Sequence, residues 1–248
     1  MPRPLWRFHR QARGFASMLG LGLVLHLASP GTEVVVARST DGGQTFEAPV
    51  VVASDACPCC RTSLDVAPDG AVSLVWRHHY DGNLRDVAFA RSADGGATFP
   101  EPGHAVASNL AYEANDAAVL SDGTLLVTFA DYGRPGERRR LERQRDWLIA
   151  SSDGGRSFSE PLLVSESCDG RGGWSSLAVS HSFGHSPPDR IFHVCAAPQL
   201  DGILLRYSDS LGEIWSAPVR VDRPRAPTRS RPSSRAPASP GIEPHEPP

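Results

Sequence analysis

The octet STDGGQTF, Ser39 to Phe46, decides the fold because it comes back three more times in the chain. The copies are SADGGATF at Ser92–Phe99, SSDGGRSF at Ser151–Phe158 and, less closely, SDSLGEIW at Ser208–Trp215. The third residue of the octet recurs after 53, 59 and 57 residues, at Asp41, Asp94, Asp153 and Ser210. A period of this length predicts a repeat architecture, in which every repeat is one supersecondary unit.

Each octet lies between two runs of strand-forming residues. EVVVARS precedes the first octet and APVVVAS follows it, and the other three octets are flanked in the same way. Short β-rich runs joined by a glycine-containing turn predict hairpins. Within the turn, we expect the Ser and Asp side chains to accept backbone N–H groups, the glycines to take positive φ angles and the aromatic ring to fold under the hairpin. The octets are therefore predicted to be structural rather than catalytic.

Two further strands precede each of the later hairpins. TSLDVAPDGAVSLVWRH and NDAAVLSDGTLLVTFAD each contain a strand, a glycine turn and a second strand. One period thus holds four antiparallel strands, which is the make-up of one β-propeller blade. We predict an all-β propeller with four-stranded antiparallel blades that is incomplete, at about 3.5 to 4 blades. An incomplete ring has open edges, and we expect self-association through them.

The chain divides into three parts by composition. Residues 31–222 carry the repeats, and residues 223–248 are rich in Pro, Arg and Ser, which predicts a disordered tail. In residues 1–30, four arginines precede the apolar stretch FASMLGLGLVLHLA, so this part resembles an export signal. The alternative is that Leu19–Leu27 is a buried strand that completes the first blade. No other segment is apolar enough to enter a membrane.

Charge and cysteine content narrow the function classes. The formal net charge is −3, which gives no electrostatic case for nucleic acid binding. The five cysteines are Cys57, Cys59, Cys60, Cys168 and Cys195. The run CPCC has no second Cys or His pair at zinc-ligand spacing, so we predict no metal and no cofactor. In an exported chain, a disulfide from this cluster to Cys168 is favoured over a metal site.

The octets resemble the Asp-box, or bacterial neuraminidase repeat, whose pattern is Ser-x-Asp-x-Gly-x-x-aromatic. Three copies match with Phe as the aromatic residue, and the fourth lacks the Asp. DACPCCRTSLDVAPDG and YEANDAAVLSDGTLL also look like segments of bacterial sialidase-family proteins of unknown substrate. The resemblance covers residues 33–222 and implies an exported, sialidase-like glycoside hydrolase that acts on terminal anionic sugars of glycans.

Two alternatives remain open at this stage. One is a non-catalytic Asp-box propeller that binds a glycan or a protein, and the other is a truncated inactive fragment. The Arg-Ile-Pro motif that precedes the first Asp-box in active sialidases is absent here, so the sequence does not decide between an enzyme and a binding module.

Candidate site residues follow from the predicted blade geometry together with the resemblance. If the octets lie at one end of the propeller, the loops that join blades and the loops between second and third strands lie at the other. A sialidase-like site needs arginines for the substrate carboxylate, an acid, and a Tyr nucleophile assisted by a carboxylate. The implied catalytic residues are Asp65, Tyr112, Glu113 and Asp131. The implied substrate-binding residues are Arg61, Arg77, Arg85, Asp116, Tyr132 and Arg134. Asp116 is an alternative acid and Tyr132 an alternative nucleophile, and each residue also has a plain structural interpretation, such as a solvated or ion-paired arginine.

Overall fold

The computed structural model describes residues 25–28, 33–54, 56–57, 60–80, 84–106, 112–131, 144–168, 175–181, 189–197 and 202–222. All regular structure in these ranges is β-strand. Within them, accordingly, no helix has the length and apolar character that a membrane span requires. The predicted tail at 223–248 and most of the predicted export signal lie outside the described residues and stay predictions.

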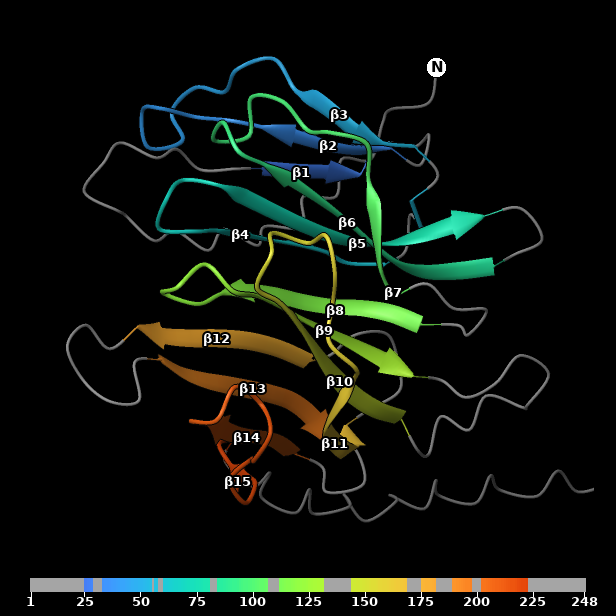
Figure 1. Cartoon of the computed structure of the whole chain (residues 1–248), viewed down its shortest axis with the longest axis vertical. Helices are drawn as coiled ribbons and strands as arrows, with labels where there is room; N and C mark the ends of the chain where they lie inside the picture. The colour runs from blue at the N-terminus through green and yellow to red at the C-terminus, as the bar shows by residue number, and fades with distance from the viewer. Residues whose placement is uncertain are drawn as a thin grey trace, which may run out of the picture.

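The strands form four antiparallel sheets (Figure 1). Sheet 1 contains β1 (Leu25–Ala28), β2 (Val34–Ala37) and β3 (Val50–Ala53). Sheet 2 contains β4 (Thr62–Val66), β5 (Val72–Tyr80), β6 (Leu84–Ser92) and β7 (Gly103–Val106). Sheet 3 contains β8 (Tyr112–Val119), β9 (Leu125–Asp131), β10 (Gln144–Ser151) and β11 (Leu162–Cys168). Sheet 4 contains β12 (Ser175–His181), β13 (Asp189–Ala197), β14 (Gly202–Ser208) and β15 (Val219–Arg220).

The sheets follow one another in chain order and pack face to face. Figure 1 shows sheet 1 at the top and sheet 4 at the bottom. The first strands meet, β4 against β8 and β8 against β12. A separate apolar cluster fills each joint between neighbouring sheets: one around Val36 and Trp76, one around Phe89 and Val127, and one around Leu148 and Ile191. This arrangement is the predicted all-β propeller with four-stranded blades, three complete and one three-stranded among the described residues.

The octets form the predicted turns between third and fourth strands. In the first octet, the Ser39 hydroxyl accepts the Gly43 N–H at 2.8 Å. The Asp41 carboxylate accepts the Thr45 N–H at 2.9 Å and the Thr45 hydroxyl at 2.6 Å. The same bonds recur in the second and third octets. In the fourth, the hydroxyl of Ser210 replaces the carboxylate and accepts the Ile214 N–H at 2.8 Å. Because these polar groups are used within the turn, the structural interpretation of the octets holds.

The glycine at the fifth position of each later octet is the point where one blade meets the preceding one. Its φ is +83° at Gly96, +91° at Gly155 and +91° at Gly212, which is a backbone region that favours glycine. A Cβ atom at Gly155 would overlap the ring of Phe89 in sheet 2, and one at Gly212 would overlap Leu148 in sheet 3. The octet backbone therefore lies directly on the third strand of the sheet before it.

The octet aromatic rings do not all behave as predicted. Phe99, Phe158 and Trp215 pack against the apolar clusters between sheets. Phe46 differs, because 38% of its surface is exposed. The reason is the packing direction: each later octet leans on the preceding sheet, and no sheet precedes sheet 1 among the described residues.

The octet carboxylates predict how stability depends on acidity. Hydrogen bonds hold the pKa of Asp41, Asp94 and Asp153 well below the ordinary value for an aspartate, the largest causes being the hydroxyls of Thr45, Ser92 and Ser157 respectively. Because the folded pKa is the lower one, this stabilisation is complete above the ordinary aspartate pKa of about 4 and is lost as the pH falls further. We expect the urea midpoint to drop below about pH 4. A variant with all three aspartates changed to Asn should be less stable at pH 7 and show a shallower drop, and an equally steep drop would contradict this account.

The two outer sheets differ in how their outward faces are covered. In sheet 1, Val35 is 8% exposed. In sheet 4, Ile203 is 43% exposed and Tyr207 is 37% exposed. The prediction of self-association through such an open face stays a prediction. Residues Leu25–Ala28, inside the apolar N-terminal stretch, form strand β1 and pair with β2.

Candidate functional site

The strand directions in the four sheets define two opposite ends of the propeller. Strand β4 starts beside the end of β5, and the Ala67–Ala71 turn between them lies next to the octet of the same sheet, since Val72 pairs with Ser92. Sheet 3 repeats this arrangement, with Leu125 paired with Ser151. We call the end with the octets the octet end and the opposite one, where β4, β8 and β12 begin, the loop end. The first strands of sheets 2, 3 and 4 all begin at the loop end, which is the end where the sequence places the blade-to-blade connections.

Asp116 ties the first strands of three sheets together. Its carboxylate accepts the hydroxyl of Ser63 on β4, the hydroxyl of Ser176 on β12 and, at 2.9 Å, the Leu177 N–H. The side chain is buried, with 8% of its surface exposed. This candidate acid is therefore a partner of both neighbouring sheets, and its position near the propeller axis serves the assembly of the blades.

Asp65 makes a second tie between sheets 2 and 3. One carboxylate oxygen accepts the Val119 N–H at 2.7 Å and the other accepts the Val66 N–H at 2.9 Å. Burial raises the pKa of the Asp65 carboxyl above its ordinary value. A raised pKa suits an acid, but both oxygens also accept backbone N–H groups, so the carboxyl group has a structural role in joining sheets 2 and 3.

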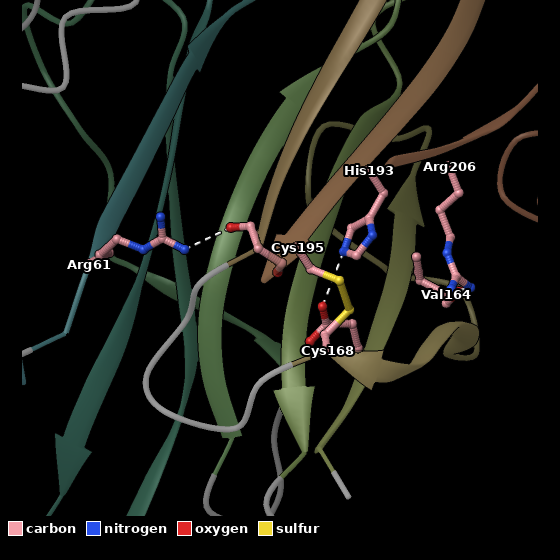
Figure 2. The surroundings of a disulfide bond; sticks show 8 residues. Arg61, Val164, Cys168, His193, Cys195 and Arg206 are labelled. Atoms are coloured by element: carbon pink, nitrogen blue, oxygen red, sulfur yellow. Dashed lines mark hydrogen bonds and ion pairs between the residues drawn. A yellow bond between two sulfur atoms is a disulfide. The ribbon is translucent and has the colours of Figure 1, made fainter. Parts of the chain in front are cut away.

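Two of the predicted arginines lie on one face of sheet 2 near the loop end, and a third lies directly before the first strand of that sheet. Arg77 and Arg85 point to the same face because Arg77 pairs with Val87, and side chains two residues apart share a face. This is the face that packs against sheet 3, because Val87 belongs to the apolar cluster between those two sheets. Arg61, directly before β4, reaches across to sheet 4 and donates to the Ser175 carbonyl at 2.7 Å (Figure 2).

These arginines carry buried donor groups. Among the described residues, the Nε atoms of Arg61 and Arg85 are buried and have no hydrogen-bond partner. Arg77 is 4% exposed, and its Nη1 lies 3.4 Å from the Cys60 sulfur. A guanidinium presents its donors as a planar fork that matches a carboxylate. This arrangement is suited to holding a carboxylate or another planar anion.

A disulfide and a buried histidine–aspartate pair lie together at the loop end of sheets 3 and 4 (Figure 2). Cys168 on β11 is bonded to Cys195 on β13. His193 Nε2 lies 3.1 Å from an oxygen of Asp146, and neither side chain has any exposed surface. Nearby, Arg206 donates to the Val164 carbonyl at 2.8 Å. Burial lowers the pKa of Arg206, and the negative charge of Asp146 opposes this shift.

This disulfide corrects the cysteine pairing that we expected from the sequence. Cys168 pairs with Cys195, so it is not joined to the CPCC run. The pairing follows from the blade arrangement, because β11 packs against β13 across the joint between sheets 3 and 4. Asp146, His193, Cys168 and Cys195 place ligand-type atoms within 4.8 Å of one another, but sulfurs that are bonded to each other are not thiolate ligands. No sequence pattern indicated the Asp146–His193 pair, because it joins residues on two different sheets.

The remaining candidates are placed by their backbone only. Tyr112 and Glu113 begin β8, and Asp131 ends β9, all at the loop end. Tyr112 and Asp131 are direct partners in the β8–β9 register. Tyr132 and Arg134 lie outside the described residues.

Comparisons with known proteins agree with this architecture. No protein-family model matches the sequence, and no curated protein matches it. The structure resembles the Hadza microbial sialidase Hz136, with a TM-score of 0.53 and 17% identity, over 74% of this chain and 39% of that one. It resembles the endo-arabinase from Bacteroides thetaiotaomicron VPI-5482, with a TM-score of 0.58 and 12% identity, over 84% and 78%. It also resembles the BP39L lectin from Burkholderia pseudomallei, with a TM-score of 0.52 and 14% identity, over 82% and 54%.

The coverage of these likenesses is unequal. The chain spans 39% of the sialidase and 54% of the lectin, and so less than two thirds of either. At such low identities the likenesses show the fold alone, which is a β-propeller.

Proposed function

We propose that the protein recognises a terminal acidic sugar of a glycan at its loop end. The observation that carries this proposal is the placement of Arg77 and Arg85 on the face of sheet 2 that turns toward sheet 3, with Arg61 directly before β4. Support comes also from the likeness to a sialidase, an arabinase and a lectin, three proteins whose names refer to carbohydrates.

The physical reason is the strength of charge-assisted hydrogen bonds at partly buried positions. An arginine that meets a carboxylate away from bulk water gains more than an exposed pair does, because the local dielectric constant is lower. The Nε donors of Arg61 and Arg85 are buried and, among the described residues, lack acceptors. A sugar carboxylate that reached them would satisfy donors that are otherwise costly to bury.

Binding is tested with immobilised glycans that end in an acidic sugar and with the matching neutral glycans. We expect the full chain to bind only the acidic set. Arg85→Gln should weaken binding by about tenfold or more, which corresponds to about 1.4 kcal/mol. Arg91→Gln is the matched control, since Arg91 lies on the same strand at the octet end and bonds the exposed Asp69. Equal binding of acidic and neutral glycans, or equal effects of the two variants, would contradict the proposal.

Hydrolysis of the bound sugar is the second candidate function, in the form of a sialidase-like exo-glycosidase. The observation that favours it is the register pairing of Tyr112 with Asp131 at the loop end, with Glu113 next in the chain. A Tyr nucleophile with a nearby carboxylate is the arrangement that sialidase chemistry uses. Since the carboxylates of Asp65 and Asp116 already hold the sheets together, Asp131 is the acid that we propose for this reaction.

A fluorogenic sialoside distinguishes hydrolysis from binding alone. If the chain is a hydrolase, it releases the fluorophore, and Tyr112→Phe abolishes release while binding persists. Tyr207→Phe is the control, because Tyr207 is on sheet 4 and stacks with Arg190 at 4.3 Å. If the full chain binds acidic glycans without any release, the protein is a binding module.

We further propose that the protein acts outside the cytoplasm. The Cys168–Cys195 disulfide is buried, and such bonds persist in oxidising compartments. The arginine-rich, apolar N-terminal stretch supports the same location.

A further inference from the structure

Cys57 and Cys60 are brought together at the start of sheet 2. The Cys60 N–H donates to the Cys57 carbonyl at 3.1 Å. The Cys60 thiol points at the Cys57 sulfur, with 2.6 Å between the two atoms. Strand β5 holds Cys57 in place, because the Cys57 N–H donates to the Arg77 carbonyl at 2.9 Å and Ala56 forms a bridge with His78. The backbone contacts therefore hold the two residues close together, and the side chains bring the sulfurs into contact.

The two cysteines have different surroundings. Cys57 is 6% exposed, whereas Cys60 is half-buried. The Nη1 atom of Arg77 lies 3.4 Å from the Cys60 sulfur. A guanidinium at this distance stabilises a thiolate relative to a thiol, and the thiolate is the reactive form of cysteine. Cys60 thus combines access to solvent with a neighbouring positive charge, and Cys57 is the less accessible partner behind it.

We propose that Cys57 and Cys60 form a thiol–disulfide exchange pair whose attacking group is Cys60. The Cys60 thiolate attacks one sulfur of a disulfide substrate, forms a mixed disulfide and releases the other half as a thiolate, which takes a proton from water. Cys57, after giving its proton to solvent, attacks the Cys60 sulfur and releases the second half as a thiol. The substrate disulfide gains two electrons and two protons, and the protein gains the Cys57–Cys60 disulfide. The same steps in reverse reduce the pair.

The Cys57–Cys60 pair differs in its surroundings from the Cys168–Cys195 disulfide. Cys168 and Cys195 are 7% and 1% exposed and belong to an apolar cluster with Ala197 and Leu204. A bond buried in this way is out of reach of an attacking thiolate. The exchange pair does not depend on the glycan proposal either, so each proposal can fail without the other.

The experiment treats the reduced full chain with glutathione disulfide and identifies modified cysteines by mass spectrometry. All variants carry Cys59→Ser, because Cys59 is in the same peptide. We expect this background protein to form the Cys57–Cys60 disulfide and to release two glutathione thiols. Adding Cys57→Ser should trap glutathione on Cys60, since the second attack is missing. Adding Cys60→Ser should give neither product. Trapping on Cys57 instead, or no disulfide in the background protein, would overturn the proposal.

The pH dependence of Cys60 alkylation tests the role of Arg77. The rate of Cys60 alkylation should reach half of its maximum at a pH below about 8.5, the ordinary midpoint for a thiol. Arg77→Gln should move that midpoint upward, and a matched urea titration shows whether this variant remains folded. If it does not fold, the midpoint of the parent protein decides: a value at or above the ordinary one contradicts activation of Cys60. One equivalent of tightly bound zinc that blocks alkylation in the purified protein would also overturn the exchange pair.

Discussion

The Gly155→Ala variant is expected to lose about 4 kcal/mol of unfolding free energy. The added Cβ atom would overlap the ring of Phe89 in the preceding sheet. This ring has little room to move, because it is 6% exposed and packs edge-on against Phe158 with their centroids 5.8 Å apart. Overpacking of a core costs about 1–3 kcal/mol, and a positive φ in a residue with a side chain costs about 1–2 kcal/mol.

The neighbouring glycine separates these two contributions. Gly154 also has a positive φ, of +75°, but the nearest atom to its added Cβ is 3.7 Å away on the Arg91 side chain. Gly154→Ala should therefore cost only the backbone strain of about 1–2 kcal/mol. Urea denaturation of both variants gives the comparison. Equal losses would mean that the octet backbone does not lie against Phe89 in solution.

The second large effect is expected for Asp116→Ala, also at about 4 kcal/mol. The variant leaves the Leu177 N–H and the hydroxyls of Ser63 and Ser176 without their shared acceptor at a buried position. Each buried donor that loses its partner costs about 1–3 kcal/mol, less for a hydroxyl that can turn elsewhere. Because the lost bonds join three sheets, we expect the variant to unfold at lower urea concentration as a whole rather than to fray at one end.

Asp122→Ala is the control for this second prediction. Asp122 is exposed in the β8–β9 turn and accepts one backbone N–H, from Thr124 at 2.8 Å. Its loss should cost below about 1 kcal/mol. Thermal unfolding followed by circular dichroism provides the measurement. A similar cost for both variants would show that Asp116 does not link the sheets.

Sequence reasoning succeeded where the information is local. The octets and their flanking strands were predictable because an Asp or Ser, two glycines and an aromatic residue specify a turn through neighbours in the chain. The repeat spacing then supplied the blades and the loop end. Even the fourth octet, with Ser210 in place of Asp and Leu211 at a φ of +55°, keeps the same turn.

Contacts between sheets could not be predicted in the same way. The Asp116 tie joins residues more than 50 positions apart, and the bond between Asp146 and His193 spans 47. Such pairs depend on how far one sheet is rotated against the next, which a repeat pattern does not specify. For the same reason, the sequence placed Cys168 with the wrong partner, and the backbone N–H groups that Asp65 accepts were not foreseen. A catalytic role for Asp65 stays a prediction.

Each joint between sheets uses the same two positions. One is the glycine at the fifth position of an octet. The other lies in the preceding sheet, three residues before the serine that begins the octet of that sheet. These pairs are Val36 with Gly96, Phe89 with Gly155 and Leu148 with Gly212. Leu205 holds the equivalent place in sheet 4 and is half-buried. If a further blade of this kind packed behind sheet 4, its own octet glycine would therefore contact Leu205.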